Sequence, residues 1–260
     1  MNNFKTPLTM KTRISAERAD ISFQNLRQFF ISRFQLSFFI LLLGTYGILC
    51  AKEKDKVLLL DFDFSKDSGS ALRDKAGKSD GIIHGAKWIK TNDRYLLSFN
   101  GKSDYVEIPL SEKSAVNEQI SVEIQATSGS WIPFIYADNA FAIRFKIKPK
   151  TFEVQIKTDK QYNMENPQKN YADNTLYYIV FTFDGQKAAL YINGEENKVI
   201  TAAGKMALAG KKILLGASNK NSGDDKPAYF FSGQIGLVKI HNKILTVEEI
   251  QKNFNSLGIK

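Results

Sequence analysis

The pattern of apolar and polar residues changes character after the first fifty positions. From residue 57 onward, apolar and polar side chains tend to alternate, which is the period of a β-strand with one buried face. The clearest runs are Phe141–Lys148 and, after Pro149, Phe152–Lys157, in which large apolar residues occupy every second position. These two runs predict a hairpin with one buried face and one face in water.

Further strands follow the same pattern, and turn signals separate them. Asp184-Gly185 and Asn193-Gly194 supply the positive φ angles that tight hairpin turns require. The other predicted strands are Val57–Phe64, Leu96–Phe99, Tyr105–Ile108, Ile120–Gln125, Tyr178–Phe183, Ala189–Ile192, Lys212–Leu215 and Gly233–Ile240. Their regular spacing predicts an all-β fold in which two antiparallel sheets form a sandwich.

One short helix is predicted at the C-terminal end of the chain. Thr246 and Glu249 have the spacing of a capping box, and Gly258 provides a stop signal. Val247, Ile250 and Phe254 form the apolar stripe of this helix. The helix and the strands together predict a single sandwich domain.

The first fifty residues carry much of the charge excess of the chain. The protein has 36 Lys and Arg against 27 Asp and Glu, a net charge of +9, and the first fifty residues hold six of the bases and two of the acids. The apolar run 36–49 that follows is about 21 Å long as a helix, short of a hydrocarbon core of about 30 Å. Residues 1–50 are therefore predicted to be an export segment, 51–56 a short charged tether and 57–260 the sandwich domain.

The only cysteine, Cys50, lies where the apolar run ends. This position resembles the lipid attachment site of a bacterial lipoprotein signal. Gly47-Ile48-Leu49 departs from the usual pattern, since it lacks Leu at −3 and a small residue at −1. The prediction is a bacterial, exported protein that is membrane-anchored on the cell envelope through Cys50 or secreted. An ordinary cleaved signal, an uncleaved anchor and a true start at Met10 stay open.

Four segments of the predicted domain occur in a recognisable order. They are Leu60–Gly85, Leu97–Pro109, Phe181–Gly194 and Phe231–Ile250. In this order they resemble the opening strand and turn, the strand–turn–strand, the hairpin and the final strand and helix of a laminin G-like domain in the concanavalin A-like lectin/glucanase superfamily. The resemblance implies a jelly-roll sandwich, with the last strand paired to the first and the helix capping the sheet edge.

The resemblance also implies one structural calcium ion. Asp74 and Asp104 match turn acids of the family, and Asp80 is the candidate for a third ligand. Asp80 is needed because Gly236 stands where the family often has Asp. The alternative is that these acids only stabilise turns through local hydrogen bonds.

The sequence argues against catalysis. It lacks the paired-carboxylate run of the glucanase branch, and it carries none of the common nucleophile, phosphate-loop or zinc-protease motifs. His84 is expected to pack at a strand end and His241 to lie at the surface. A divergent glycan-degrading enzyme stays open only if acids from different strands converge. One cysteine and two histidines exclude a disulfide framework and a His-rich metal site.

Two groups of residues are candidates for ligand binding. Trp131 and Tyr136 are aromatic residues near predicted loops, although large aromatics also close the ends of sandwich cores. The second group is cationic, lies on the outer face of the predicted hairpin and would attract polyanions such as sulfated glycans: Arg144, Lys146, Lys148 and Lys157. The alternative for this group is a solvated face that protects the sheet from association.

The predicted function is a non-catalytic binding module whose partner is a glycan or a cell-surface or extracellular protein. The alternative is a structural or scaffolding envelope lipoprotein without a carbohydrate site. Nucleic acid is not expected as a partner, because export removes the opportunity and the predicted domain carries only a modest positive charge.

Overall fold

The computed structural model describes residues 58–77, 79–91, 94–110, 119–206, 208 and 212–258. The chain divides into two units, Met1–Lys54 and Asp55–Lys260, and every described residue belongs to the second. The predicted export segment, the tether and Cys50 lie outside the described residues. Within the described ranges, no helix combines the length and hydropathy needed to cross a membrane.

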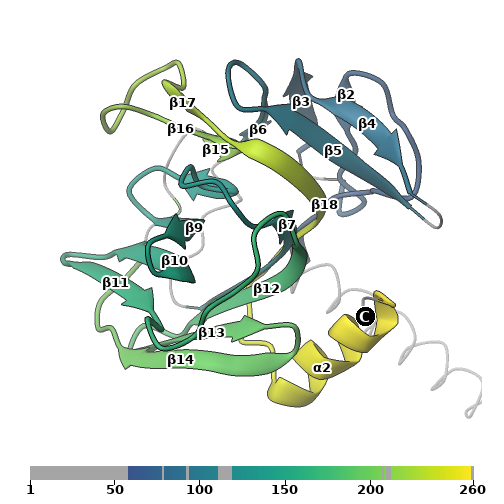
Figure 1. Ribbon diagram of the computed structural model, residues 1–260. Helices are drawn as coiled ribbons and strands as arrows, with labels where there is room; N and C mark the ends of the chain where they lie inside the picture. Colours follow the sequence, from purple (N-terminus) through teal and green to yellow (C-terminus); the bar gives the residue numbers. More distant parts are fainter. Residues whose placement is uncertain are drawn as a thin grey trace, which may run out of the picture. The chain divides into compact units, whose positions relative to one another are not determined.

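Two antiparallel sheets make up the described unit, as Figure 1 shows. Sheet I has the strand order β14-β13-β12-β7-β18-β5-β4, and β1 pairs with β18 at its side. Its strands are β1 (Leu58–Asp61), β4 (Lys87–Lys90), β5 (Tyr95–Asn100), β7 (Ile120–Thr127), β12 (Leu176–Phe183), β13 (Lys187–Ile192), β14 (Glu195–Thr201) and β18 (Ser232–His241).

Sheet II has the strand order β11-β10-β9-β8-β15-β6-β3-β2. Its strands are β2 (Ala71–Leu72), β3 (Gly81–His84), β6 (Tyr105–Pro109), β8 (Ile135–Ala137), β9 (Phe141–Ile147), β10 (Lys150–Lys157), β11 (Gln161–Glu165) and β15 (Lys212–Leu215). A two-stranded ribbon of β16 (Ala217–Ser218) and β17 (Tyr229–Phe230) contacts β8.

The core lies between the inner faces of the two sheets, as the alternation predicts. Fully buried rings come from both sheets and from their connections: Phe134, Phe145, Phe152, Phe181 and Phe231. Burying one such side chain contributes about 1.5–3 kcal/mol, so this layer is the main source of stability. The prediction of an all-β, two-sheet sandwich with a short C-terminal helix is confirmed.

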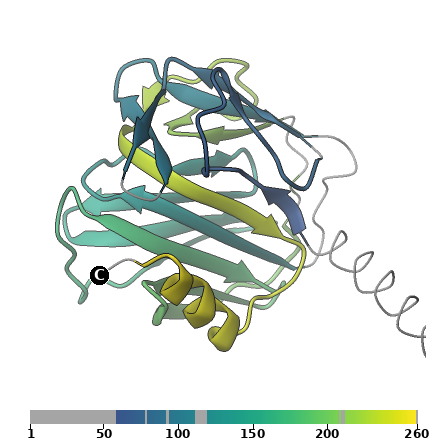
Figure 2. The same cartoon turned by 90° about the vertical axis from the view of Figure 1, so that its right-hand side faces the viewer.

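The helix α2 (Val247–Ser256) begins at the predicted capping box. The Thr246 hydroxyl accepts a hydrogen bond from the Glu249 N–H at 3.2 Å, and the Glu249 carboxylate accepts one from the Thr246 N–H at 3.0 Å. Figure 2 shows α2 against the outer side of sheet I, where Ile250 joins a second small core with Tyr178 and Val180 of β12.

One detail of the predicted topology is confirmed and one is wrong. The last strand, β18, does pair with the first, β1. The helix does not cap a sheet edge, because β12, on which it packs, lies between β13 and β7. The reason is hydrophobic: the apolar stripe of α2 needs an apolar surface, and alternate residues of β12 supply one.

Candidate ligand-binding site

A hollow of about 440 Å³ opens on the outer face of sheet II, where β8, β9 and β10 meet the β16–β17 ribbon. Its lining includes three aromatic side chains, Trp131, Tyr136 and Tyr229. Trp131 is 45% exposed and Tyr229 is 47% exposed, although large rings usually bury more of their surface. Trp131 therefore does not close the end of the core, which was the alternative left open by the sequence.

The ring of Trp131 is held in place by a buried ion pair. The Arg144 guanidinium lies 4.4 Å from the ring centroid, a cation–π distance. Arg144 Nη2 lies 3.1 Å from Glu153 Oε1, and Glu153 is only 4% exposed. The β9–β10 register places these two residues directly opposite one another. The result is a preorganised aromatic surface at the side of the hollow.

The space in the hollow exists because a small residue stands between larger ones. Ala142 of β9 is paired with Tyr136 of β8 on one side and with Gln155 of β10 on the other. All three residues line the hollow. A methyl group between two long side chains leaves a depression in the sheet surface, and alternation directs all three residues to the same outer face.

The four predicted cations do not form one continuous basic surface in the structure. Lys146 Nζ lies 2.7 Å from Glu165 Oε2, and Arg144 is paired with Glu153. Lys148 and Lys157 are exposed, but the β9–β10 register places them at opposite ends of the hairpin. Counting charges along the hairpin missed Glu165, because β11 brings that acid beside β10 only in the folded sheet.

The acids predicted to bind calcium lie in turns. Asp74 Oδ1 accepts hydrogen bonds from the Asp61 N–H at 2.9 Å and the Ala76 N–H at 3.0 Å. Asp80 accepts one from the Asp74 N–H at 2.8 Å and forms an ion pair with Arg73. These two donors hold the pKa of Asp80 below its ordinary value.

The third predicted ligand, Asp104, accepts a hydrogen bond from the Asn100 N–H at 3.0 Å. Among the described residues, no group of three His, Cys, Asp or Glu side chains is placed to hold a metal ion. A Cβ at Gly236 would lie 2.2 Å from Leu96 Cδ2 and 2.9 Å from Gln125 Oε1, so an aspartate there would require both side chains to move. These contacts are those of acids that stabilise turns, and calcium binding by Asp74, Asp80 and Asp104 stays a prediction.

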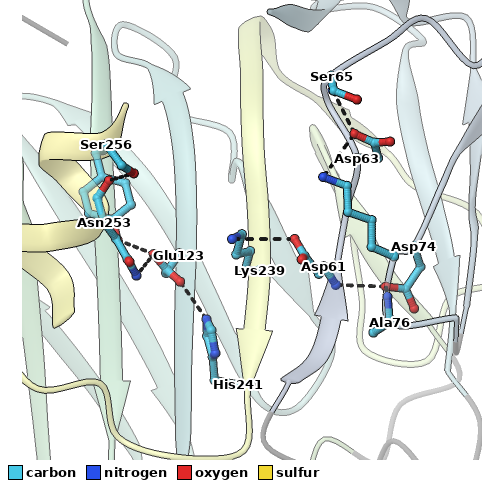
Figure 3. Close-up of polar contacts among 12 residues, drawn as sticks. Asp61, Asp63, Ser65, Asp74, Ala76, Glu123, Lys239, His241, Asn253 and Ser256 are labelled. Carbon is cyan, nitrogen blue, oxygen red and sulfur yellow. Dashed lines mark hydrogen bonds and ion pairs between the residues drawn. The ribbon is translucent and has the colours of Figure 1, made fainter. Parts of the chain in front are cut away.

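A buried polar cluster beneath α2 was not anticipated from the sequence. Glu123 of β7 is 1% exposed, and its Oε1 lies 2.6 Å from His241 Nε2 of β18. Its Oε2 accepts hydrogen bonds from Asn253 Nδ2 of α2, at 3.0 Å, and from the Tyr178 hydroxyl. Figure 3 shows the Glu123 carboxylate between His241 and Asn253. The expectation that His241 lies at the surface is wrong, since this residue is only 9% exposed.

The environment of Glu123 changes its acidity. Burial by itself raises the pKa of a carboxyl group, but hydrogen bonds from His241 and Tyr178 outweigh it and lower the pKa of Glu123 below its ordinary value. Burial and the nearby carboxylate raise the pKa of the Tyr178 hydroxyl. Because α2 contributes one of the partners, the cluster attaches the helix to sheet I. His84, by contrast, stacks on Tyr105 at a centroid distance of 4.3 Å, as expected for a structural role.

Comparison with protein families identifies the fold family. Residues 100–251 match the Laminin_G_3 model, which is described as concanavalin A-like lectin/glucanases superfamily. The chain belongs to this superfamily. The match confirms the resemblance that the ordered motifs predicted for the concanavalin A-like superfamily, and it includes the hollow from Trp131 to Tyr229. No curated protein matches the chain.

Solved structures similar to this chain include the binding domain of a mosquitocidal protein and structures of botulinum neurotoxins. The binding domain of Paraclostridial Mosquitocidal Protein 1 aligns with a TM-score of 0.61 and 14% identity, covering 78% of this chain and 53% of that one. Another is a structure of botulinum neurotoxin type C, whose cell entry is dependent upon interaction with two ganglioside molecules. It aligns with a TM-score of 0.60 and 15% identity, covering 79% of this chain and 52% of that one. The chain thus spans about half the length of these structures, and at this identity the likeness establishes the fold.

Proposed function

We propose that the described unit is a non-catalytic binding module that takes a glycan in the hollow beside Trp131. The observation that carries the proposal is the pair of aromatic rings, Trp131 and Tyr229, that line one hollow while nearly half exposed. Such rings offer an apolar surface to the C–H face of a sugar, and Gln155 in the same lining offers its amide to the sugar hydroxyls. A concave surface with a few polar groups is typical of small-ligand sites.

The comparisons support a binding role over a catalytic one. Several of the similar structures are binding domains, one of them in complex with SialylT and another in complex with rat synaptotagmin II. A protein ligand is therefore the second candidate, and it becomes the better one if no glycan binds.

The carboxylates near the hollow already form ion pairs or hydrogen bonds within the protein, which also supports a non-catalytic role. Glycoside hydrolysis requires two carboxyl groups that face one sugar. Glu153 is paired with Arg144, and Asp138 accepts hydrogen bonds from the Tyr136 hydroxyl at 2.9 Å and the Gly223 N–H at 2.7 Å. Neither carboxylate is placed as a nucleophile or a proton donor toward the hollow.

A glycan array with the full chain tests the proposal. The wild-type protein and an Ile82→Ala control, altered at an exposed residue of β3 outside the hollow, are expected to bind the same glycans. Trp131→Ala is expected to bind them about tenfold more weakly, the equivalent of about 1.4 kcal/mol. Binding is expected to be equal in calcium and in EDTA, because none of Asp74, Asp80 and Asp104 lines the hollow. An array without signal, or equal binding by Trp131→Ala, would contradict the proposal.

We also propose that the protein is exported and anchored through a lipid on Cys50. Support comes from the sequence alone: a basic segment, a short apolar run and the single cysteine directly after it. Anchoring would place the binding module at the outer surface of a membrane, where glycans of the cell envelope or of other cells are accessible.

A further inference from the structure

A separate hollow of about 370 Å³ opens at the edge of sheet I, where β13 turns into β14. We call it the edge hollow. Phe254 from the last turn of α2 and Tyr171 from the segment before β12 complete its lining. Among the described residues, none lines both the edge hollow and the hollow beside Trp131. The two hollows are therefore independent of one another.

Two partly buried aromatic rings line the edge hollow. Phe254 stacks on Tyr178 at a centroid distance of 6.1 Å, and it lies so close to the β13–β14 turn that a Cβ at Gly194 would be 3.2 Å from Phe254 Cδ1. Tyr171 packs edge-on against Phe152 at a centroid distance of 5.0 Å. Both rings are therefore held in place by the fold, and the face of an aromatic ring attracts a cation.

Two carboxylates of the lining have no counter-ion. Glu195 and Glu196 are exposed at the start of β14, and neither forms an ion pair within the part of the chain that the structure describes. Burial raises the pKa of the Tyr171 hydroxyl, and the nearby Glu195 carboxylate adds to this effect. Lys169 is the one cation among the described residues of the lining, so the edge hollow carries an excess of negative charge. Such a surface attracts cations and repels anions.

A buried amide in the lining lacks a donor for its oxygen. Asn197 is only 7% exposed and is the extra residue of a β-bulge between β13 and β14. Its Nδ2 donates a hydrogen bond to the Tyr171 hydroxyl, whereas its Oδ1 has no hydrogen-bond partner among the described residues. A buried acceptor without a donor is destabilising. A ligand that brings an N–H group to this oxygen would remove that cost.

The lining favours a primary ammonium group over other cations. Calcium and magnesium require several oxygen ligands, and no group of three His, Cys, Asp or Glu side chains in the described ranges is placed to hold a metal ion. A quaternary ammonium group suits the rings and the carboxylates, but it has no N–H to offer Asn197 Oδ1. A primary ammonium group has three N–H donors and meets all three features of the lining.

We propose that the edge hollow binds a primary ammonium group carried on a hydrocarbon chain. The ammonium group lies beside the carboxylates of Glu195 and Glu196 and donates to Asn197 Oδ1, and the hydrocarbon chain lies against the rings of Tyr171 and Phe254. A lysine side chain of a partner protein and a free polyamine offer this same chemistry. The proposal goes beyond the glycan site and does not depend on it.

Nuclear magnetic resonance titration of the isotope-labelled full chain with n-butylamine at neutral pH tests the proposal. Signals of the Asn197 side-chain amide and of the Gly194 N–H are expected to shift, and added salt is expected to weaken the binding. Butyltrimethylammonium is expected to bind about fivefold more weakly or worse, because it has no N–H donor. Butyrate and calcium chloride are expected to leave these signals unchanged.

Two substitutions with opposite effects locate the ammonium group. Glu195→Gln is expected to weaken the binding of butylamine about fivefold, because one carboxylate is lost. Lys169→Ala is expected to strengthen it about twofold or more, because the competing cation of the lining is removed. Glu248→Gln makes the same change of charge outside the lining, so it is the matched control and is expected to leave the affinity unchanged. All three residues are exposed, so these variants are expected to fold.

Two larger probes distinguish the sources of the ammonium group. Tighter binding of a lysine-containing peptide than of spermidine would indicate a protein partner, and the reverse order would indicate a free polyamine; either result supports the proposal. The proposal is overturned if no amine shifts the Asn197 and Gly194 signals, if butyltrimethylammonium binds as tightly as butylamine, or if calcium shifts the same signals. A Lys169→Ala protein that binds butylamine no more tightly than the wild type would overturn it as well.

Discussion

Glu123 is a carboxylate that lies beneath a helix and receives hydrogen bonds from three elements. Tyr178, His241 and Asn253 reach it from β12, β18 and α2. Leaving a buried charge without one of its donors costs more than losing the same bond at the surface. Trp131 differs from Glu123 because it is exposed: its ring contacts the Arg144 guanidinium and stays accessible to a ligand.

Tyr178→Phe is expected to lower the free energy of unfolding by about 1.5–3 kcal/mol, because it removes the hydroxyl that donates to the Glu123 carboxylate. Urea unfolding measures the change. Tyr191→Phe is the matched control, since Tyr191 is buried in the same small core, and its effect is expected to be about 0.5 kcal/mol or less. Equal and small effects of the two changes would show that the cluster does not stabilise the fold.

The lowered pKa of Glu123 predicts how stability depends on pH. A carboxyl group whose folded pKa lies below its ordinary value of 4.5 contributes stability above that pH, and the contribution is lost as the pH falls through the folded pKa. The difference in unfolding free energy between the wild type and Glu123→Gln is therefore expected to shrink as the pH falls below about 4.5. Urea unfolding at several pH values measures it, and a difference that grows in acid would contradict the assignment.

At the scale of elements, α2 is attached by its first turn as well as by its apolar stripe. The capping box fixes the helix start, and Lys243 forms an ion pair with Glu249 of that turn. The Ser121 hydroxyl of β7 accepts a hydrogen bond from the Leu245 N–H at 2.9 Å, just before the helix. Together these contacts set the angle at which the chain leaves β18 and crosses sheet I.

Thr246→Ala is expected to cost about 1 kcal/mol of stability, because the Glu249 N–H loses its acceptor. Thr246→Asp keeps an acceptor and is expected to stay close to the wild type. Lys252→Ala, an exposed change in the same helix, is the control and is expected to have an effect within about 0.5 kcal/mol. A Thr246→Ala variant as stable as this control, by urea unfolding, would show that the cap is dispensable.

The strands with the clearest alternation could be predicted from the sequence, but β11, β14 and most of the strand partners could not. Alternation identified β9, β10 and β12, because a two-residue period depends only on neighbours along the chain. Tyr229 reaches the hollow from β17, and Glu165 of β11 forms an ion pair with Lys146, and nothing near Trp131 in the sequence points to either. Glu123 lies on the outer face of β7 and would be exposed to solvent if α2 did not cover it. The local signals for the hollow were Trp131 and Tyr136, aromatic residues near predicted loops, and Ala142, a small residue among large ones, is a signal that the sequence analysis missed.

At the scale of the whole molecule, the chain combines a described sandwich with an N-terminal segment of different composition. Four motifs in order were enough to predict the superfamily, since turns and strand starts are local features. The export segment rests on charge and hydropathy alone. If it functions as proposed, the net charge of +9 belongs partly to export and only partly to the binding module.

Cys50→Ser is expected to release the protein from the membrane fraction and to abolish incorporation of a palmitate label. The change lies outside the described residues, so glycan binding is expected to be unchanged. Fractionation and labelling of cells that express the two forms measure the outcome. Continued membrane association, with mobility unchanged, would refute lipid attachment at this cysteine.

The central claim is that the hollow beside Trp131, where β8, β9 and β10 meet the β16–β17 ribbon, is where the ligand lies. Ala142 lines this hollow between the larger side chains of Tyr136 and Gln155. The most direct measurement is calorimetric titration of Ala142→Leu with the array glycan that binds the wild type most tightly, after circular dichroism has confirmed the fold. The account predicts that binding falls below detection because the new side chain fills the hollow. Unchanged affinity in a folded Ala142→Leu protein would place the ligand elsewhere.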